Sequence, residues 1–168
     1  MEASHDPTSW QHWFREHGPR LLACARQWTR SQADAEDVVQ DAFVRYWRLQ
    51  RGLDAAAIPL LITSIRRAAF DRARREGRRT RREQAVAGED EGIFQPWPEG
   101  DDRRLQLEAA LARLPDGQRD VLALKIWGEL TFEQIGMELG VSPNTAASRY
   151  RYALAALRTE LSTVTCHG

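Results

Sequence analysis

Three carboxylates in the first third of the chain are the first candidates for binding or catalysis. Asp34, Asp37 and Asp41 stand at i, i+3 and i+7, which places them on one face of a helix. Gln40 borders that face. Such a face fits metal binding in an enzyme, a solvated helix surface, or a docking surface for a basic helix of a partner protein. Because a catalytic metal usually takes ligands from more than one element, the docking surface is favoured.

A dense run of arginines follows within residues 66–82. Helical spacing aligns several of them into a ridge: Arg67, Arg74, Arg75 and Arg78. Guanidinium groups bind phosphates well, so nucleic acid is the natural ligand, although the carboxylate of Asp71 interrupts the ridge. A disordered basic tail or a solvated helix end is the alternative reading of such a charge run. Apolar residues directly before the run favour an anchored helix.

A helix-turn-helix pattern occupies Leu130 to Leu161. Thr131 with Gln134 predicts a capping box at the start of a short helix, and Gly140 predicts its left-handed end. Ser142-Pro143 then predicts the cap and first residue of a second helix. Plain packing of two amphipathic helices would give the same pattern.

The second of these helices has two faces. Its inward stripe is expected at Ala146, Tyr150, Leu154 and Leu157. Side chains that can meet base edges and phosphates are expected to point away: Asn144, Thr145, Ser148, Arg151 and Tyr152. This pattern is typical of a DNA recognition helix.

The spacing of apolar residues predicts that helices carry these side chains, and no segment alternates as a strand does. The first helix is expected within residues 9–30, interrupted or restarted at His17-Gly18-Pro19. A second, capped by Ser31 or Asp34, ends near Gly52. Its core-facing residues are expected to be Val38, Val39, Ala42, Phe43, Tyr46 and Trp47. A third begins at about Leu60 and runs into the arginines.

A connector without apolar periodicity precedes a second helical lobe, which begins near Arg103. The fold class is therefore all-α, with two small helical domains joined by a flexible acidic linker. The 168 residues are 42% hydrophobic and 29% charged, as in ordinary globular proteins. With no apolar run near the roughly 20 residues that cross a bilayer and no signal pattern, we expect a cytoplasmic protein. The two cysteines, Cys24 and Cys166, do not have the spacing of a metal site, and the four histidines do not have it either. We therefore expect no metal and no cofactor.

The net charge is zero, because 24 Lys and Arg balance 24 Asp and Glu, which is unlike a protein that grips DNA unaided. The charges are segregated into acidic, basic and again acidic stretches. This alternation predicts several partners, with nucleic acid on the basic surface and a positively charged protein on the acidic ones.

Five short sequence motifs follow one another along the chain. They are Asp34–Trp47 (DAEDVVQDAFVRYW), Ile65–Arg75 (IRRAAFDRARR), Leu114–Arg119 (LPDGQR), Leu130–Gly136 (LTFEQIG) and Asn144–Arg149 (NTAASR). In this order they resemble the motifs of extracytoplasmic-function sigma factors, members of the sigma-70 family of bacterial RNA polymerase initiation factors. The resemblance covers roughly residues 9–160, and five motifs in sequence are specific where one would be weak.

The resemblance implies a non-enzymatic factor that directs RNA polymerase to promoters. Residues 9–83 would form region 2, residues 84–102 an acidic linker that runs toward the RNA exit path, and residues 103–162 region 4. Asp37, Gln40 and Asp41 would bind a coiled coil of the largest polymerase subunit. The loop from Leu49 to Leu60 and the next helix would capture the non-template strand of the −10 element. Basic residues near that DNA would be Arg66, Arg67, Arg74 and Arg75.

The second lobe would bind the −35 duplex and touch the polymerase flap. Its implied DNA-binding residues are Asn144, Thr145, Ser148, Arg149, Arg151 and Tyr152. An anti-sigma factor is a further candidate partner, and no membrane is expected among the partners.

Some positions depart from the family pattern. Ala147 and Tyr152 stand where many members carry a basic residue, and Arg67 where many carry Asn, so a promoter sequence cannot be transferred. The loop from Leu49 to Leu60 has no aromatic residue for stacking on flipped bases, which predicts weak melting and a strict promoter. A self-sufficient helix-turn-helix regulator and a metal-dependent nucleic-acid-processing enzyme remain as alternatives, although no nucleophile or phosphate-binding glycine loop supports the enzyme.

Overall fold

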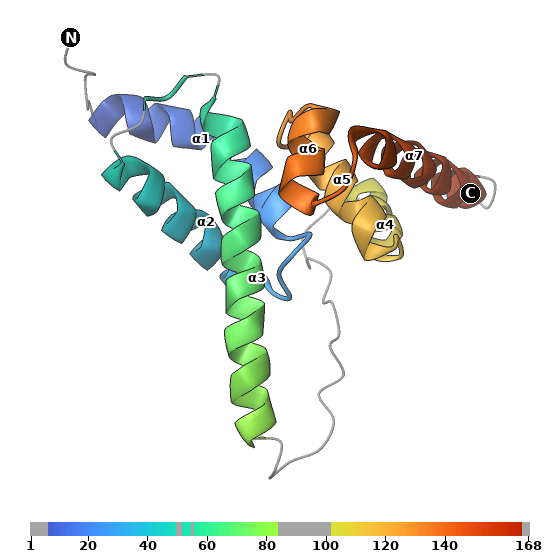
Figure 1. Cartoon of the computed structure of the whole chain (residues 1–168), viewed down its shortest axis with the longest axis horizontal. Helices are drawn as coiled ribbons and strands as arrows, with labels where there is room; N and C mark the ends of the chain where they lie inside the picture. Colours follow the sequence, from blue (N-terminus) through green and yellow to red (C-terminus); the bar gives the residue numbers. More distant parts are fainter. Residues whose placement is uncertain (1–6, 50–51, 55, 84–101, 166–168) are drawn as a thin grey trace. The chain divides into compact units, whose positions relative to one another are not determined.

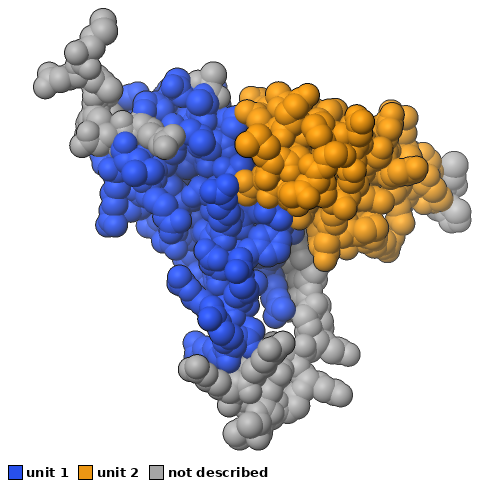
Figure 2. Space-filling model, viewed as in Figure 1, with its two compact units in different colours: residues 1–94 blue, residues 95–168 orange. Residues whose placement is uncertain are grey.

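A computed structural model describes residues 7–49, 52–54, 56–83 and 102–165, and every regular element in these ranges is an α-helix (Figure 1). The chain divides into two compact units, residues 1–94 and residues 95–168 (Figure 2). The predicted all-α fold with two helical lobes is confirmed. The expected acidic linker lies outside the described residues, except for Asp102. None of the helices described is both long enough and apolar enough to cross a membrane.

The first helix, α1 (Pro7–Ala25), continues through the segment where the sequence predicted a break. His17-Gly18-Pro19 lies inside it, so the expected interruption was wrong. A proline inside a helix costs a backbone hydrogen bond, but packing can outweigh that cost. Gly18 is buried, and a Cβ added there would lie 3.3 Å from the Phe14 ring. Buried side chains anchor the turns on both sides of Pro19: Trp10, Leu21, Cys24 and Ala25.

Two longer helices complete the first unit, α2 (Gln32–Arg48) and α3 (Ala57–Glu83), and both pack with α1. Ser31 caps α2, as predicted, whereas the helix ends at Arg48 rather than near Gly52. The Tyr46 hydroxyl donates to the Gly52 carbonyl at 2.8 Å, which ties the following segment back to α2. The fully buried core comes from all three helices and includes Leu21, Val38, Val39, Leu61, Ile62 and Ile65.

The second unit contains α4 (Asp102–Ala112), α5 (Asp116–Ile126), α6 (Phe132–Leu139) and α7 (Pro143–Thr165). The long α7 packs against each of the other three helices. One apolar cluster joins α4, α5 and α7: Ala110, Leu111, Leu114, Leu122, Ala153 and Leu157. Because this cluster anchors one face of α7, the opposite face remains available to solvent.

Candidate protein-docking and nucleic-acid interfaces

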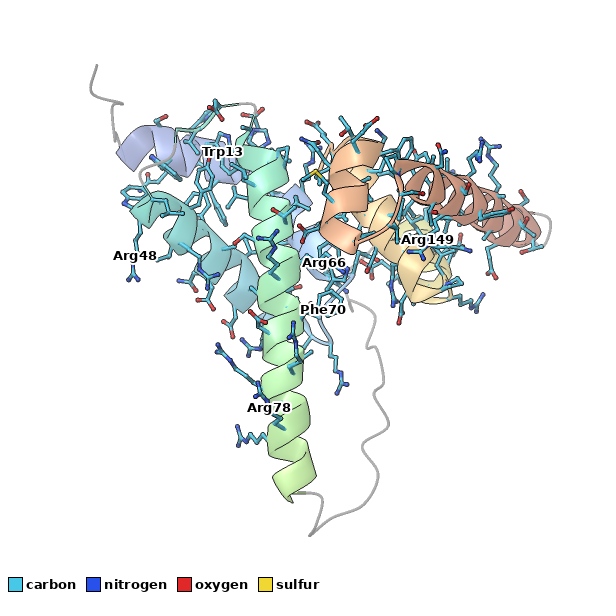
Figure 3. The ribbon with its side chains drawn as sticks, viewed as in Figure 1. Trp13, Arg48, Arg66, Phe70, Arg78 and Arg149 are labelled. Carbon is cyan, nitrogen blue, oxygen red and sulfur yellow. The ribbon has the colours of Figure 1, made fainter. Side chains whose placement is uncertain are left out.

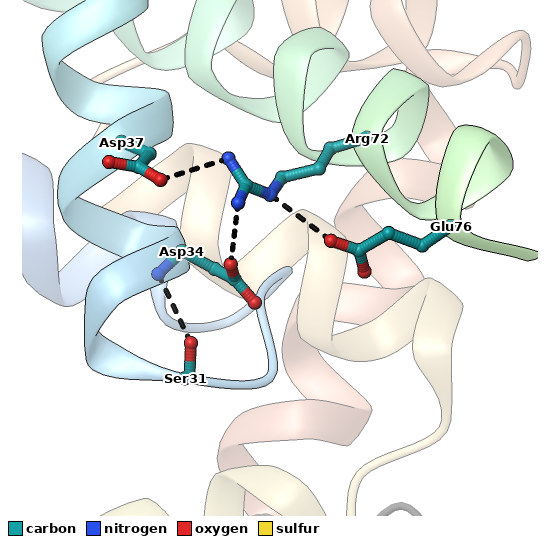
Figure 4. Close-up of polar contacts among 5 residues, drawn as sticks. All are labelled: Ser31, Asp34, Asp37, Arg72 and Glu76. Carbon is teal, nitrogen blue, oxygen red and sulfur yellow. Dashed lines mark hydrogen bonds and ion pairs between the residues drawn. The ribbon is translucent and has the colours of Figure 1, made fainter. Parts of the chain in front are cut away.

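Arg72 of α3 lies against the first turns of α2 and pairs with two of its carboxylates (Figure 4). Its Nη2 lies 2.9 Å from Asp34 Oδ1, and its Nη1 lies 3.1 Å from Asp37 Oδ2. Its Nε donates to Glu76 Oε1 at 3.3 Å, one turn further along α3. Burial lowers the pKa of the Arg72 guanidinium, but the charges of Asp34 and Asp37 outweigh burial and raise that pKa above its ordinary value.

These contacts divide the acidic face of α2 into two parts. Asp34 is 23% exposed, and its backbone N–H donates to Ser31 Oγ at 3.1 Å, so this residue serves the fold. Asp37 is 54% exposed and is also tied to Arg72. Gln40 and Asp41 are exposed. The Arg72 guanidinium of the chain itself faces Asp34 and Asp37. The part of the chain that the structure describes contains no group of three or more His, Cys, Asp or Glu residues that could hold a metal ion.

An apolar groove of about 910 Å³ lies beside Gln40, between α1 and α2. Large apolar side chains form much of its lining: Trp10, Phe14, Phe43, Val44 and Trp47. Trp10 packs against two of the other aromatic rings. Its ring centroid lies 5.1 Å from that of Phe43 and 4.7 Å from that of Trp47. Trp47 was expected to face the core but is 37% exposed, and Val44 is 42% exposed. Polar side chains complete the lining: Gln11, Arg15, Glu36 and Gln40. An exposed apolar patch with polar residues around it is typical of interaction sites.

A second surface of the same unit follows α3. Arg66, Arg67 and Arg74 line one open pocket, with Phe70 and Asp71 between them. The Arg66 guanidinium carbon lies 4.6 Å from the centroid of the Phe70 ring, and Figure 3 shows these two side chains next to each other along the helix. Arg74 Nη2 lies 3.4 Å from Asp71 Oδ1, so the carboxylate that interrupts the ridge is paired within it.

Further along α3, Arg75 and Arg78 are exposed, and Arg78 Nε donates to the Arg74 carbonyl at 3.3 Å. The structure therefore brings three of the four predicted −10 residues into one pocket. Arg75 lies on the same helix but is not part of the pocket lining.

The helix-turn-helix has the local chemistry that the sequence predicted. Thr131 Oγ1 accepts from the Gln134 backbone N–H at 3.2 Å, and the Thr131 N–H donates to Gln134 Oε1 at 2.9 Å. Gly140 ends α6 with φ of 68°. Gly136 is required for a different, steric reason: a Cβ added there would lie 2.6 Å from the Val141 carbonyl oxygen. The turn thus leaves no room for a larger residue in α6 at this point.

Thr145, a candidate DNA-binding residue, takes part in the N-terminal cap of α7. Ser142 Oγ accepts from the Thr145 N–H at 3.1 Å, and the two hydroxyl groups are 2.9 Å apart. Asn144, Arg151 and Tyr152 are exposed, with Tyr152 at 66%. Arg151 Nη2 donates to Ser148 Oγ at 3.2 Å.

Arg149 differs from the other candidate DNA-binding residues. A Cβ added at Gly117 of α5 would lie 3.1 Å from Arg149 Nη1, so the guanidinium rests against that glycine. Arg149 is only half-exposed in consequence. The inward stripe is as expected at Ala146 and Leu157, which are buried, and sequence reasoning missed Ala153, which is fully buried.

Comparison with known proteins gives these surfaces a family context. The protein-family model for Sigma-70 region 2 matches residues 13–79, and the family model for Sigma-70, region 4 matches residues 104–157. The ECF RNA polymerase sigma factor SigL of Mycobacterium tuberculosis (strain ATCC 35801 / TMC 107 / Erdman) is 31% identical over 157 residues, which cover 88% of this chain and 86% of the relative. The chain belongs to the extracytoplasmic-function sigma factors. This sigma factor acts in transcription initiation.

Other relatives agree with this placement. The ECF RNA polymerase sigma factor SigK of Mycobacterium bovis (strain BCG / Pasteur 1173P2) is 29% identical to this sigma factor over 164 residues, 93% of this chain and 87% of the relative. Among solved structures, the sigma factor RpoE in complex with the anti-sigma factor NepR from Bartonella quintana has a TM-score of 0.69 and 23% identity, covering 92% of this chain and 97% of that one. CnrH in complex with the cytosolic domain of CnrY has a TM-score of 0.53 and 24% identity, covering 96% and 92%. The two structures share the fold of this sigma factor.

Proposed function

We propose that this sigma factor binds the core polymerase through α2 and reads promoter DNA through α3 and α7. On α2, the core-binding residues are Asp37, Gln40 and Asp41, and the partner is a coiled coil of the largest polymerase subunit. The observation that carries the proposal is the apolar groove, whose lining includes the exposed Gln40. The exposed Asp41 follows Gln40 on the same helix. A groove lined by aromatic residues and bordered by charge suits an amphipathic helix with a basic edge.

The −10 surface is assigned to α3. Arg66, Arg67, Arg74 and Arg75 contact the DNA there, and a pocket lined by three of these arginines supports the assignment. In the second unit, α7 enters the −35 major groove, and the same unit also touches the polymerase flap. The proposed contacts on α7 are Asn144, Thr145, Ser148, Arg149, Arg151 and Tyr152.

The factor supplies binding surfaces, and the polymerase supplies the chemistry of RNA synthesis. It works in the cytoplasm, where these partners are. An anti-sigma factor is a further proposed partner, since the similar RpoE structure is a complex with the anti-sigma factor NepR.

Run-off transcription on genomic fragments with purified core polymerase tests the proposal. Discrete transcripts that need both core and this factor are the expected result. Tight, specific DNA binding by the isolated factor without any factor-dependent transcript would favour the self-sufficient regulator instead.

A further inference from the structure

The groove between α1 and α2 exposes apolar side chains in the free factor. Phe14, Val44 and Trp47 belong to its lining, and each of them is more than a third exposed. The two helices pack against each other, so these side chains form one connected surface rather than scattered positions. Removal of such a surface from water is favourable, and the free factor is stabilised by a partner that covers it.

Two opposite charges lie in the same lining, one on each helix. Arg15 is exposed on α1, and Glu36 is exposed on α2. Gln32 Nε2 donates to Glu36 Oε1 at 2.6 Å, but a neutral amide does not cancel the negative charge of a carboxylate. The groove therefore presents apolar side chains together with one cationic and one anionic residue.

These two charges distinguish between kinds of partner. A partner surface of a single sign places a like charge against either Arg15 or Glu36, which weakens binding. The carboxylates that suit a basic partner, Asp37 and Asp41, are not part of the groove lining. The occupant that suits the lining itself has an apolar centre with both a positive and a negative group.

A second copy of this chain has that combination. In a two-fold symmetric contact the same surface faces itself, so a residue that contacts a second residue is contacted by it in return. Arg15 of each copy then pairs with Glu36 of the other copy, and the apolar side chains of the two grooves cover one another. The net charge of zero removes the general repulsion that keeps strongly charged proteins apart.

We propose that the free factor forms a two-fold symmetric dimer through the groove between α1 and α2. The apolar side chains are buried at the centre of the contact, and two ion pairs between Arg15 and Glu36 flank it. The dimer also covers Gln40, which lines the groove and is a proposed core-binding residue, so self-association and core binding exclude each other. The dimer is independent of the proposed function, whereas this competition rests on it.

Sedimentation equilibrium of the full-length factor over a range of concentrations tests the dimer. We expect the mass of the wild type to rise reversibly from that of a monomer to that of a dimer. Arg15→Glu and Glu36→Arg each set like charges against each other in both ion pairs and should raise the dimer dissociation constant more than about tenfold. Glu16→Arg makes the same change as Glu36→Arg at an exposed residue of α1 outside the groove lining, and this control should dimerise like the wild type.

A mixture of the two single variants separates specific pairing from damage to the fold. In a heterodimer of Arg15→Glu with Glu36→Arg, both contacts again join opposite charges, so the equimolar mixture should dimerise within about threefold of the wild type. A wild-type factor that stays monomeric up to about 0.1 mM would overturn the proposal. Single variants that dimerise like the wild type, or a mixture that stays monomeric, would overturn it as well.

Core polymerase added to the same samples tests the competition. It should convert the wild-type dimer into a complex with a single copy of the factor. A complex in which core polymerase carries the intact dimer would contradict the mutual exclusion. Core polymerase that bound neither the wild type nor the monomeric variants would refute the proposed core-binding function and leave the dimer in place.

Discussion

Arg72 and Asp34, whose Nη2 and Oδ1 atoms are 2.9 Å apart, join the arginine-bearing helix α3 to the first turn of α2. The same guanidinium reaches Asp37, a proposed core-binding residue. The Arg72 side chain therefore joins the proposed polymerase-binding surface of α2 to the helix that carries the proposed −10 surface.

Replacement of Arg72 by alanine should destabilise the first unit. Partly exposed ion pairs contribute about 0.2–1 kcal/mol each, so the loss of this network should cost about 1–2 kcal/mol. The midpoint of thermal unfolding should fall by several degrees, and the difference should shrink at about 1 M NaCl because salt screens the pairs. Arg78→Ala on the same helix is the control and should unfold like the wild type. Equal midpoints for the Arg72 and Arg78 variants would show that the network does not stabilise the unit.

Two helical glycines should respond in opposite directions to alanine. Gly136→Ala should destabilise the helix-turn-helix by about 1–3 kcal/mol, because the added Cβ would lie 2.6 Å from the Val141 carbonyl oxygen. Gly77→Ala in α3 meets nothing within 4 Å and should stabilise its helix by up to about 1 kcal/mol. Hydrogen exchange in α6 and α3 measures both effects. Unchanged protection of α6 in Gly136→Ala would contradict the close packing of this turn.

The helix-turn-helix could be predicted in detail from sequence because its signals are local. The capping box of Thr131 and Gln134, the left-handed Gly140 and the cap at Ser142 each depend on residues within a few positions of one another. Local signals gave a wrong prediction at Pro19, where a break in the helix was expected. Buried residues on both sides of Pro19 keep α1 continuous.

Contacts between helices could not be predicted in this way. Nothing in the spacing of Asp34 and Asp37 indicates that Arg72 lies opposite them, since the pairing depends on how α2 packs against α3. The groove at Trp47 and the packing of Arg149 against Gly117 have the same origin. Helical periodicity alone assigned Trp47 to the core, because a large apolar residue at the edge of a stripe has the same spacing as a buried one.

Arg151 should contribute to −35 binding without affecting the fold, because it is exposed on α7. We expect Arg151→Ala to reduce promoter binding by the holoenzyme at least about fivefold, the loss that corresponds to about 1 kcal/mol. Arg158→Ala, also exposed on α7, is the control and should bind normally. Filter binding at several salt concentrations measures both variants. Normal promoter binding by Arg151→Ala would remove this residue from the interface.

The free factor should bind promoter DNA poorly. Its net charge is zero, so we expect the polymerase to supply most of the phosphate contacts. Gel shifts with and without core enzyme check this, and a specific complex should form only with core. A tight specific complex of the factor alone would support the helix-turn-helix regulator.

The promoter should tolerate few changes in its −10 element. Transversion of a single −10 base should lower transcription more than about tenfold, the scale of one lost base contact. Run-off transcription from a set of such promoters provides the measurement. Near-normal transcription from most of them would contradict a strict promoter.

The proposed contact between α2 and the polymerase is measured by the affinity of core polymerase for an Asp41→Lys factor. Asp41 is a better probe than Asp37, because reversal of the Asp37 charge would also break its pair with Arg72. Glu16→Lys makes the same charge change on α1 at a side chain that is 62% exposed, and it is the matched control. We predict that Asp41→Lys weakens core binding more than about tenfold while Glu16→Lys binds like the wild type. Equal affinities for the wild-type and Asp41→Lys factors would show that this face of α2 does not bind the polymerase.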